Sequence, residues 1–304
     1  MPSKKLYWAR LSIASNSLLC VMKIVVGVLT GSVSVIAEGL HSGVDLLASL
    51  ITFFAVRISA KEADARHHFG HGKFENVAGM AEGLLIFLGG FLIIYEAVPK
   101  LFSGHGPESL GWGVGVMAAS SVVNFFVSRK LFKVAKDTGS PALEADAWHL
   151  RTDVYTSAGV LGGLALIRLT GMYIFDPIVA IVVAGFIMKA AYEITMEGIA
   201  HMTDVALPEP EIELIKAAVL KYGEQFSDFH DLRARKSGSQ RFIDLHLVVP
   251  RELQIYRVHD ICDKIEESIM SDLPDTHVLI HAEPCELGCG KCSLGTGKDS
   301  GPCM

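Results

Sequence analysis

Long apolar segments recur through the first two hundred or so residues, separated by short polar connections. Residues 83–95 and 110–128 contain no charged side chain, which is typical of segments that cross a lipid bilayer. Such a helix needs ~20 residues to cross the hydrocarbon core. We therefore predict six transmembrane helices, at about residues 8–30, 33–57, 76–99, 110–129, 143–169 and 174–197.

Beyond Asp204 the pattern changes to a charged sequence with shorter periods. Strict alternation in RFIDLHLVV predicts a strand whose aliphatic side chains face a core and whose Asp244 and His246 face away from it. Segments with apolar residues at helical spacing occur before and after this strand. The predicted order is helix, strand, strand, helix and strand, an α/β ferredoxin-like domain (αββαβ), at residues 210–224, 229–236, 241–249, 258–273 and 277–284.

The change of pattern divides the chain into three parts. We predict a six-helix transmembrane transport domain at residues 1–205, a cytosolic ferredoxin-like metal-binding domain at 206–285 and a flexible Cys/Gly-rich tail at 286–304. Lysine and arginine gather before the first span and in the connections after the second and fourth spans. By the positive-inside rule, both termini are predicted to lie in the cytoplasm.

Composition supports a membrane protein. Of the 304 residues, 50% are hydrophobic and 20% charged, and the mean hydropathy of +0.39 argues against a plain soluble globule. The net charge of −6 provides no basic surface for nucleic acid. GTGKDSG near the C-terminus is a poor match to a nucleotide-binding loop, so no nucleotide is expected either.

Two predicted spans carry ionisable residues in matching pairs. His41 and Asp45 lie four residues apart in the second span, and His149 and Asp153 repeat that spacing in the fifth. Residues four apart share one face of a helix, and burying a carboxylate at the bilayer centre costs at least ~2.5 kcal/mol. Two imidazoles and two carboxylates suit a tetrahedral metal site. The alternative is a polar face that lines a water cavity without metal.

The sequence resembles the cation diffusion facilitator family over nearly its whole length. The resemblance rests on GSVSVIAEGLHSGVDLLAS, HHFGHGKFENVAG, ALEADAWHLRTDVYTSAGV, DVALP, HDLR, RFIDLHL and VLIHAEP. It implies a dimeric antiporter of a bacterial inner (cell) membrane that exchanges a divalent metal, usually zinc, for protons. It also implies that His41, Asp45, His149 and Asp153 form the transport site. Some bacterial relatives have Asp at the first of these positions, and histidine there is associated with zinc selectivity.

A second cluster lies in KEADARHHFGHGKFE, between the second and third spans. The resemblance implies a metal site at Asp64, His67 and His71, with the adjacent His68 as a further candidate. The alternative is a solvated polar turn whose glycines only permit tight geometry. Nearer the third span, Lys73 is predicted to form an ion pair with Asp204 that joins the two domains.

A third constellation lies in the predicted cytosolic domain. Alternation turns His246 and His281 away from the apolar faces of their strands. The resemblance implies that His230, His246 and His281 are ligands and that His259 bridges a second ion, with Glu283 where relatives usually have Asp. Farther on, Cys285, Cys289 and Cys292 are candidate thiolate ligands, although their C-x-x-x-C-x-x-C spacing is not that of a zinc ribbon.

These patterns predict a secondary active transporter and not an enzyme. An intramembrane zinc protease would need H-E-x-x-H or a comparable arrangement, and the sequence contains none. We expect a homodimeric antiporter in the bilayer that exports Zn²⁺ from the cytoplasm against protons, with Zn²⁺ as both substrate and regulatory ligand. Two alternatives stay open: a transporter selective for Cd²⁺, Co²⁺, Fe²⁺ or Mn²⁺, and a membrane metal sensor that does not transport.

Overall fold

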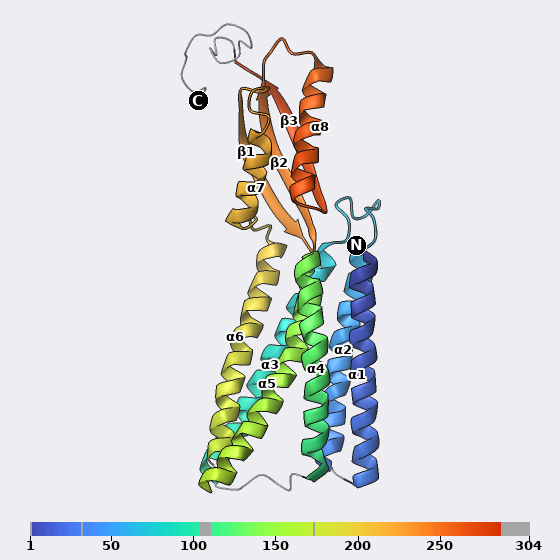
Figure 1. Cartoon of the computed structure of the whole chain (residues 1–304), viewed down its shortest axis with the longest axis vertical. Coiled ribbons are helices and arrows are strands. Elements are labelled where there is room, and N and C mark those ends of the chain that lie inside the picture. Colours follow the sequence, from blue (N-terminus) through green and yellow to red (C-terminus); the bar gives the residue numbers. More distant parts are fainter. Residues whose placement is uncertain (1, 32, 104–110, 173, 287–304) are drawn as a thin grey trace. The chain divides into compact units, whose positions relative to one another are not determined.

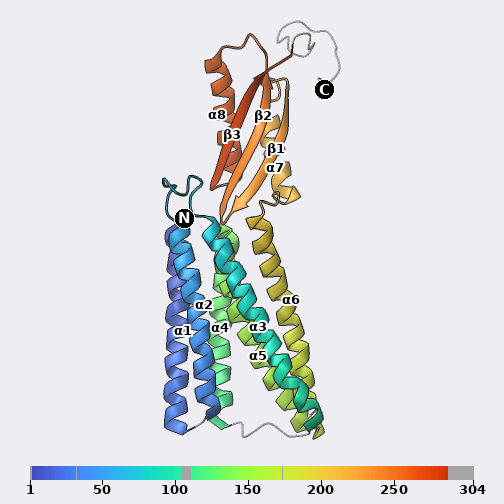
Figure 2. The same ribbon diagram turned by 180° about the vertical axis from the view of Figure 1, so that it is seen from behind.

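The computed structural model describes residues 2–31, 33–103, 111–172 and 174–286. Two compact units make up the chain: an N-terminal unit up to Met202 and a C-terminal unit from Thr203. Figure 1 and Figure 2 show the N-terminal unit as long helices and the C-terminal unit as a small sheet with two helices. The candidate thiolate ligands Cys289 and Cys292, in the predicted Cys/Gly-rich tail, lie outside the described residues.

Six long helices form the N-terminal unit. In the tightest pairings α1 packs against α2, α3 against α6, and α4 against α5. Their bounds are α1 Pro2–Thr30, α2 Val33–Ser59, α3 Lys73–Ser103, α4 Gly111–Thr138, α5 Pro141–Thr170 and α6 Phe175–Met202. Each predicted span lies within or overlaps one of these helices, and most helices extend beyond the predicted bounds.

Four of these helices are long and apolar enough to cross a membrane among the described residues: α1, α2, α3 and α6. The helices α4 and α5 are not among them. α5 carries Glu144, Asp146, His149, Arg151 and Asp153 in its first half, which lowers its mean hydropathy. The prediction of six spans therefore stays a prediction for α4 and α5.

Local chemistry fixes where α5 begins and ends. Ser140 has extended backbone geometry, and its hydroxyl accepts a hydrogen bond from the Leu143 N–H, so it caps the first turn. Pro141 follows at the start of the helix, where the missing N–H costs nothing. Gly171 adopts φ of 73° at the other end, a conformation that glycine reaches without strain. The polar first half of α5 is thus held in a well-defined helix.

The C-terminal unit has the predicted order of helix, strand, strand, helix and strand: α7 Glu209–Leu220, β1 Asp228–Ser237, β2 Gln240–Val249, α8 Ile255–Asp272 and β3 Thr276–Pro284. β2 lies between the other two strands, antiparallel to β1 and parallel to β3. The αββαβ prediction is confirmed. The helix predicted at 210–224 ends earlier, at Leu220.

One face of this sheet forms a core with both helices. Ile243, Leu245 and Leu247 of β2 are fully buried, and they join one apolar cluster with Ile215 of α7 and Ile265 of α8. The alternation in β2 predicted these inward residues. The polar residues between them therefore belong to the opposite face of the sheet.

Candidate metal sites

The predicted membrane site comes together where α2 meets α5. His149 Nε2 lies 3.1 Å from Asp45 Oδ1, and both side chains are less than one tenth exposed. His41 Nε2 lies 4.0 Å from the same oxygen. One ligand atom each from His41, Asp45 and Asp153 lies within 4.8 Å of the others, close enough to share one cation. The two His-x-x-x-Asp pairs therefore meet around Asp45.

Two neighbouring groups were not anticipated from the sequence. Asn124 of α4 donates a hydrogen bond from Nδ2 to Asp153 Oδ2 at 3.1 Å. Lys23 of α1 is buried and donates to Ser42 Oγ at 2.8 Å, and Ser42 is the residue after His41 on α2. The amide orients one carboxylate, and the lysine fixes the α2 turn that carries His41. Outer contacts of this kind fix how a ligand presents its oxygen to a metal.

The loop between α2 and α3 holds the second predicted cluster. His67 Nδ1 lies 3.3 Å from Asp64 Oδ1, and His71 Nε2 lies 3.4 Å from Asp64 Oδ2. The ring centroids of the two histidines are 4.4 Å apart. Gly70, with φ of 77°, permits the turn that brings His71 back toward Asp64. These three residues form a compact group with the spacing of a metal site.

Two backbone N–H groups stabilise the ionised form of Asp64, which is the form that binds a cation. The N–H groups of Arg66 and His67 each donate to Asp64 Oδ1 at 2.8 Å. These hydrogen bonds hold the pKa of the Asp64 carboxyl below its ordinary value. The carboxylate is therefore ionised at neutral pH without needing a metal. His68 is not part of the group that surrounds it.

Three histidines form one row across the sheet of the C-terminal unit. His230 of β1 pairs in register with His246 of β2, which pairs in register with His281 of β3. Neighbouring ring centroids are 5.2 and 4.9 Å apart. Glu283, two residues beyond the row on β3, faces all three rings, with oxygen–nitrogen distances of 3.5 Å to His230, 3.0 Å to His246 and 3.6 Å to His281.

An irregularity in β1 accompanies this row. The register of β1 against β2 shifts between His230 and Arg233, and Asp231 adopts φ of 50°. An extra residue of this kind bends a strand and re-aims the side chain next to it. His230, His246 and Glu283 place one ligand atom each within 4.8 Å of the others.

Other predicted ligands are not brought into these groups. His259 lies on α8, exposed and 3.4 Å from Asp263, whereas the histidine row belongs to the sheet face opposite the helices. Its role as a ligand to a second ion stays a prediction. Cys285 is buried at the end of β3, and its predicted partners lie outside the described residues. The thiolate site likewise stays a prediction.

The predicted ion pair between Lys73 and Asp204 would join the two units. Within the N-terminal unit, Lys73 Nζ donates to the Met202 carbonyl at 3.4 Å. Within the C-terminal unit, Asp204 pairs with Arg235 at 3.2 Å. Each residue thus has a partner inside its own unit, and the pair between the units stays a prediction.

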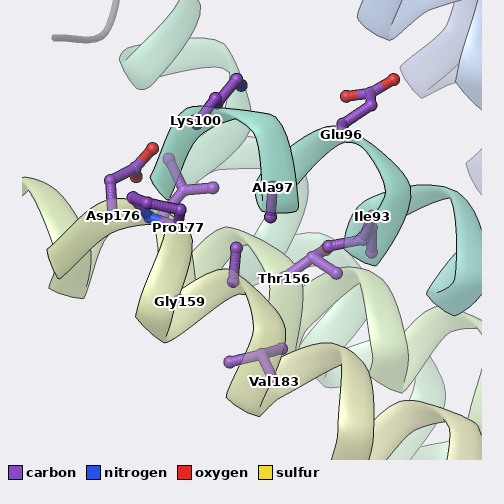
Figure 3. A pocket seen from close by; sticks show the side chains of 11 residues that line it. Ile93, Glu96, Ala97, Lys100, Thr156, Gly159, Asp176, Pro177 and Val183 are labelled. Carbon is purple, nitrogen blue, oxygen red and sulfur yellow. The ribbon is translucent and has the colours of Figure 1, made fainter. Parts of the chain in front are cut away.

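A cavity of about 270 Å³ lies elsewhere, between the last turns of α3, the middle of α5 and the start of α6. Figure 3 shows its lining side chains, which include the charged residues Glu96, Lys100 and Asp176. None of the residues predicted as metal ligands lines this cavity. The cavity is therefore separate from the three groups described above.

Comparison with known proteins identifies the family. Residues 9–202 match the model of the cation efflux transmembrane domain, and residues 207–285 match that of the cation efflux protein cytoplasmic domain. The chain belongs to the cation diffusion facilitator family. This confirms the resemblance read from the sequence motifs. Members of the family are cation efflux transporters, so the chain is a membrane transporter of metal cations and not an enzyme.

Relatives cover almost the whole chain. An uncharacterized transporter of Synechocystis sp. is 34% identical over 279 residues, which span 92% of this chain and 90% of the relative. The cation-efflux pump FieF of Cronobacter sakazakii is 32% identical over 271 residues, 89% of this chain and 90% of that protein. A solved chain of the zinc transporter candidate CzrB is 30% identical, covers 27% of this chain and 100% of that chain, and gives a TM-score of 0.26.

Proposed function

We propose that this cation diffusion facilitator exports Zn²⁺ from the cytoplasm in exchange for protons. The observation that carries the proposal is the 3.1 Å contact between His149 of α5 and Asp45 of α2. It joins the two polar pairs into one group, with His41 and Asp153 beside it. Zn²⁺ is the transported substrate of this group, held by two imidazole nitrogens and two carboxylate oxygens.

Proton exchange follows from the chemistry of these ligands. An imidazole binds metal only through an unprotonated nitrogen, and a carboxylate binds metal only when it is ionised. Metal and protons therefore compete for His149, Asp45 and their neighbours. Protons that arrive from the acidic side of the membrane displace the metal to that side, and a proton gradient directed inward drives export.

The donor set favours zinc over harder ions. Mg²⁺ and Mn²⁺ prefer octahedral sites rich in oxygen, whereas Zn²⁺ accepts tetrahedral coordination by two nitrogens and two oxygens. The nitrogens are those of His41 and His149. Cd²⁺, Co²⁺ and Fe²⁺ accept nitrogen ligands as well, so the donor set ranks zinc first without excluding them.

We assign supporting roles to the other two groups. The ionised Asp64, with His67 and His71, collects metal in the loop between α2 and α3. The histidine row with Glu283 binds Zn²⁺ as a regulatory ligand and stabilises the cytoplasmic domains of a homodimer. Binding to the folded domain alone would stabilise it by ~2.7 kcal/mol at a metal concentration one hundred times Kd. The basic connections support an inner-membrane location with both termini in the cytoplasm.

Flux in sealed proteoliposomes tests the proposal. Vesicles loaded with a zinc-sensitive dye should report zinc movement that follows an imposed pH gradient and is lost in Asp153→Ala. Asp137→Ala is the matched control, because Asp137 is an exposed aspartate that pairs with Lys4 at 3.0 Å, away from the site. Zinc movement that ignores both the gradient and Asp153→Ala would rule out the mechanism. Zinc binding without flux in any variant would instead indicate a sensor.

A further inference from the structure

The N-terminal unit contains two buried acids that the transport site does not use. Glu82 of α3 and Asp146 of α5 are both 0% exposed. The Thr52 hydroxyl donates to Glu82 Oε1, and the Ser49 hydroxyl donates to Asp146 Oδ1 at 3.0 Å. The second carboxyl oxygen of each residue is buried, with no hydrogen-bond partner among the described residues.

Close packing of α3 on α5 brings these acids together. A Cβ atom at Gly79 would lie 3.4 Å from the Pro141 carbonyl oxygen and 3.9 Å from Ala145 Cβ. Glu82 follows Gly79 by about one helical turn, on the same side of α3, and Asp146 is the residue after Ala145. Their hydrogen-bond donors, Thr52 for Glu82 and Ser49 for Asp146, lie three residues apart on one face of α2, so both carboxyl groups are held beside neighbouring turns of that helix.

In the part of the chain that the structure describes, neutral polar side chains of α1 and α2 line this pair, and His149 lies three residues after Asp146 on α5. α2 contributes Thr52 and Ser49, and α1 contributes the Ser12 and Asn16 side chains, which contact Ser49 at 3.1 and 2.7 Å. α6 approaches α3 at Gly83 through Ala191 and Thr195. Two ion pairs on the same group of helices have their charges matched within the pair: Lys5 of α1 lies 2.8 Å from Glu75 of α3, and Lys189 lies 3.8 Å from Glu193 on α6.

Two buried carboxylates of like charge are expensive to ionise together. Removing each charge from water is unfavourable, and the mutual repulsion of the two charges adds to that cost. A neutral carboxyl group avoids both costs. It also supplies an O–H donor, which an ionised carboxylate lacks. A proton on either acid would convert its unpartnered oxygen from a buried charge-bearing acceptor into a neutral O–H donor.

We propose that Glu82 and Asp146 form a proton-holding site, separate from the metal ligands, that is coupled to metal binding one turn away. The proposal deepens, and rests on, the proton-coupled transport proposed above. Without metal, one proton is shared by the pair. When a divalent cation binds at Asp45 and His149, its positive charge favours the ionised pair, and the proton leaves as H⁺. After the metal departs, a proton returns to the pair, so charge and protons balance over a cycle.

The polar contacts offer a route between the pair and the metal site. Ser49 bonds to Asp146 and lies one turn of α2 from Asp45. Asp146 lies three residues before His149 on α5. The proton-holding site thus adds to the number of protons released when metal binds, beyond those that the four proposed ligands release themselves.

Counting protons released on zinc binding tests this proposal. Purified full-length protein in detergent is titrated with Zn²⁺ in a weakly buffered solution that contains a pH indicator. The double variant Glu82→Gln with Asp146→Asn mimics the neutral pair and should release about one proton fewer per zinc than the wild type. Glu96→Gln is the matched control on α3, because Glu96 lines the separate cavity, and it should release the wild-type number.

The outcomes separate this proposal from the proposed function. Proton release equal to wild type in a folded double variant that still binds zinc would overturn the proton-holding site. If Asp45→Ala still abolished zinc transport, the proposed function would stand without it. Infrared difference spectra of the wild type are a second measurement that requires no variant to fold. They should show a protonated carboxyl band that disappears on addition of Zn²⁺ and survives exchange into Mg²⁺, and its absence would also overturn the proposal.

Discussion

The group around Asp45 and the histidine row with Glu283 offer the same kinds of ligand, imidazole and carboxylate. The centre of the first group is buried, whereas the second lies on an exposed sheet face. Asp45 of α2 and His149 of α5 are buried, and the two residues lie 104 positions apart in the chain. The histidines of the row come from neighbouring strands, and His281 keeps 65% of its side chain exposed. Water already solvates the exposed row. The buried group depends on its own partners for solvation.

This difference in burial indicates which of the two groups transport requires. Removing a partner from the buried group leaves a charge or a polar atom unsatisfied within the bilayer, which affects both stability and transport. Removing one histidine from the row exposes the remaining ligands to water at little cost. We therefore expect the buried group to carry transport and the row to adjust it.

The largest effect is expected for His149→Ala. This change leaves Asp45 buried without its 3.1 Å partner, so transport should be abolished and the free energy of unfolding should fall by ~3–5 kcal/mol. Zinc flux and thermal unfolding in detergent measure the two effects. His201→Ala, which removes a histidine paired with the exposed Glu197, is the control and should retain most flux. Retained transport in His149→Ala would contradict the assignment of transport to the buried group and of regulation to the histidine row.

Asn124→Ala should have the next largest effect. The asparagine amide orients Asp153 through a 3.1 Å hydrogen bond, and loss of such outer contacts typically lowers metal affinity ~10–100-fold. Zinc dependence of the initial rate should shift to higher concentrations by this factor. Ser128→Ala on the same helix is the control, since Ser128 contacts Phe125 and Arg151 and not the proposed ligands. An unchanged zinc dependence would show that Asp153 needs no support from α4.

A smaller and more selective effect is expected for His41→Asp. The replacement changes the donor set from two nitrogens and two oxygens to one nitrogen and three oxygens, which weakens the preference for zinc. Of the three proposed ligands with a described ion pair, His41 is the most exposed, with 61% of its side chain exposed, so folding should be preserved. Competition between Zn²⁺ and Cd²⁺ during uptake measures the change. Identical competition in the variant and the wild type would argue against His41 as a ligand.

The smallest effect concerns the C-terminal unit at low pH. Burial alone would raise the pKa of the Glu211 carboxyl, but Arg241 at 2.5 Å and Lys236 at 3.2 Å outweigh it and lower the pKa. The resulting stabilisation is present above the unfolded pKa of the glutamate and is lost as the pH falls through the lowered folded pKa. Glu211→Gln should thus cost ~1 kcal/mol or less near pH 7 and nothing in strong acid.

Hydrogen exchange of β1 and β2 amides, compared between variant and wild type at each pH, measures that difference. Glu213→Gln is the control, because Glu213 pairs with the exposed Lys216 and does not contact the sheet residues named above. A loss of protection that grows as the pH falls would contradict the assigned ion pairs.

The sequence predicted much of both regions because their signals are periodic. Charges four residues apart in two apolar helices marked the buried group, and alternation in β2 marked which residues face the core. The order of helices and strands along the C-terminal unit also followed from these periods. Alternation fixes the face of a strand but not its pairing, so the alignment of His230, His246 and His281 in one row needed the structure.

Single polar residues escaped prediction for a related reason. Asn124 and Glu82 each stand alone in an apolar stretch, and Asp146 lies among the other charged residues of α5. The partners of all three lie on other helices. No spacing within one helix reveals such a contact. The signal available in the sequence was the free-energy cost of placing an ionisable side chain in a membrane span. Because of that cost, such a residue usually has a partner or a function. Applied to the third and fifth spans, that criterion would have singled out Glu82 and Asp146.

The most direct test compares the two regions in one assay. Zinc uptake into proteoliposomes under an imposed pH gradient, together with bound zinc per protein, is measured for the wild type, Asp45→Ala, and His246→Ala combined with His281→Ala. Asp45→Ala should abolish transport while the row still binds zinc. The double histidine variant should lose bound zinc and zinc-dependent activation but keep proton-coupled transport. Complete loss of transport in a folded, dimeric double histidine variant would contradict the division into a transport site and a regulatory site.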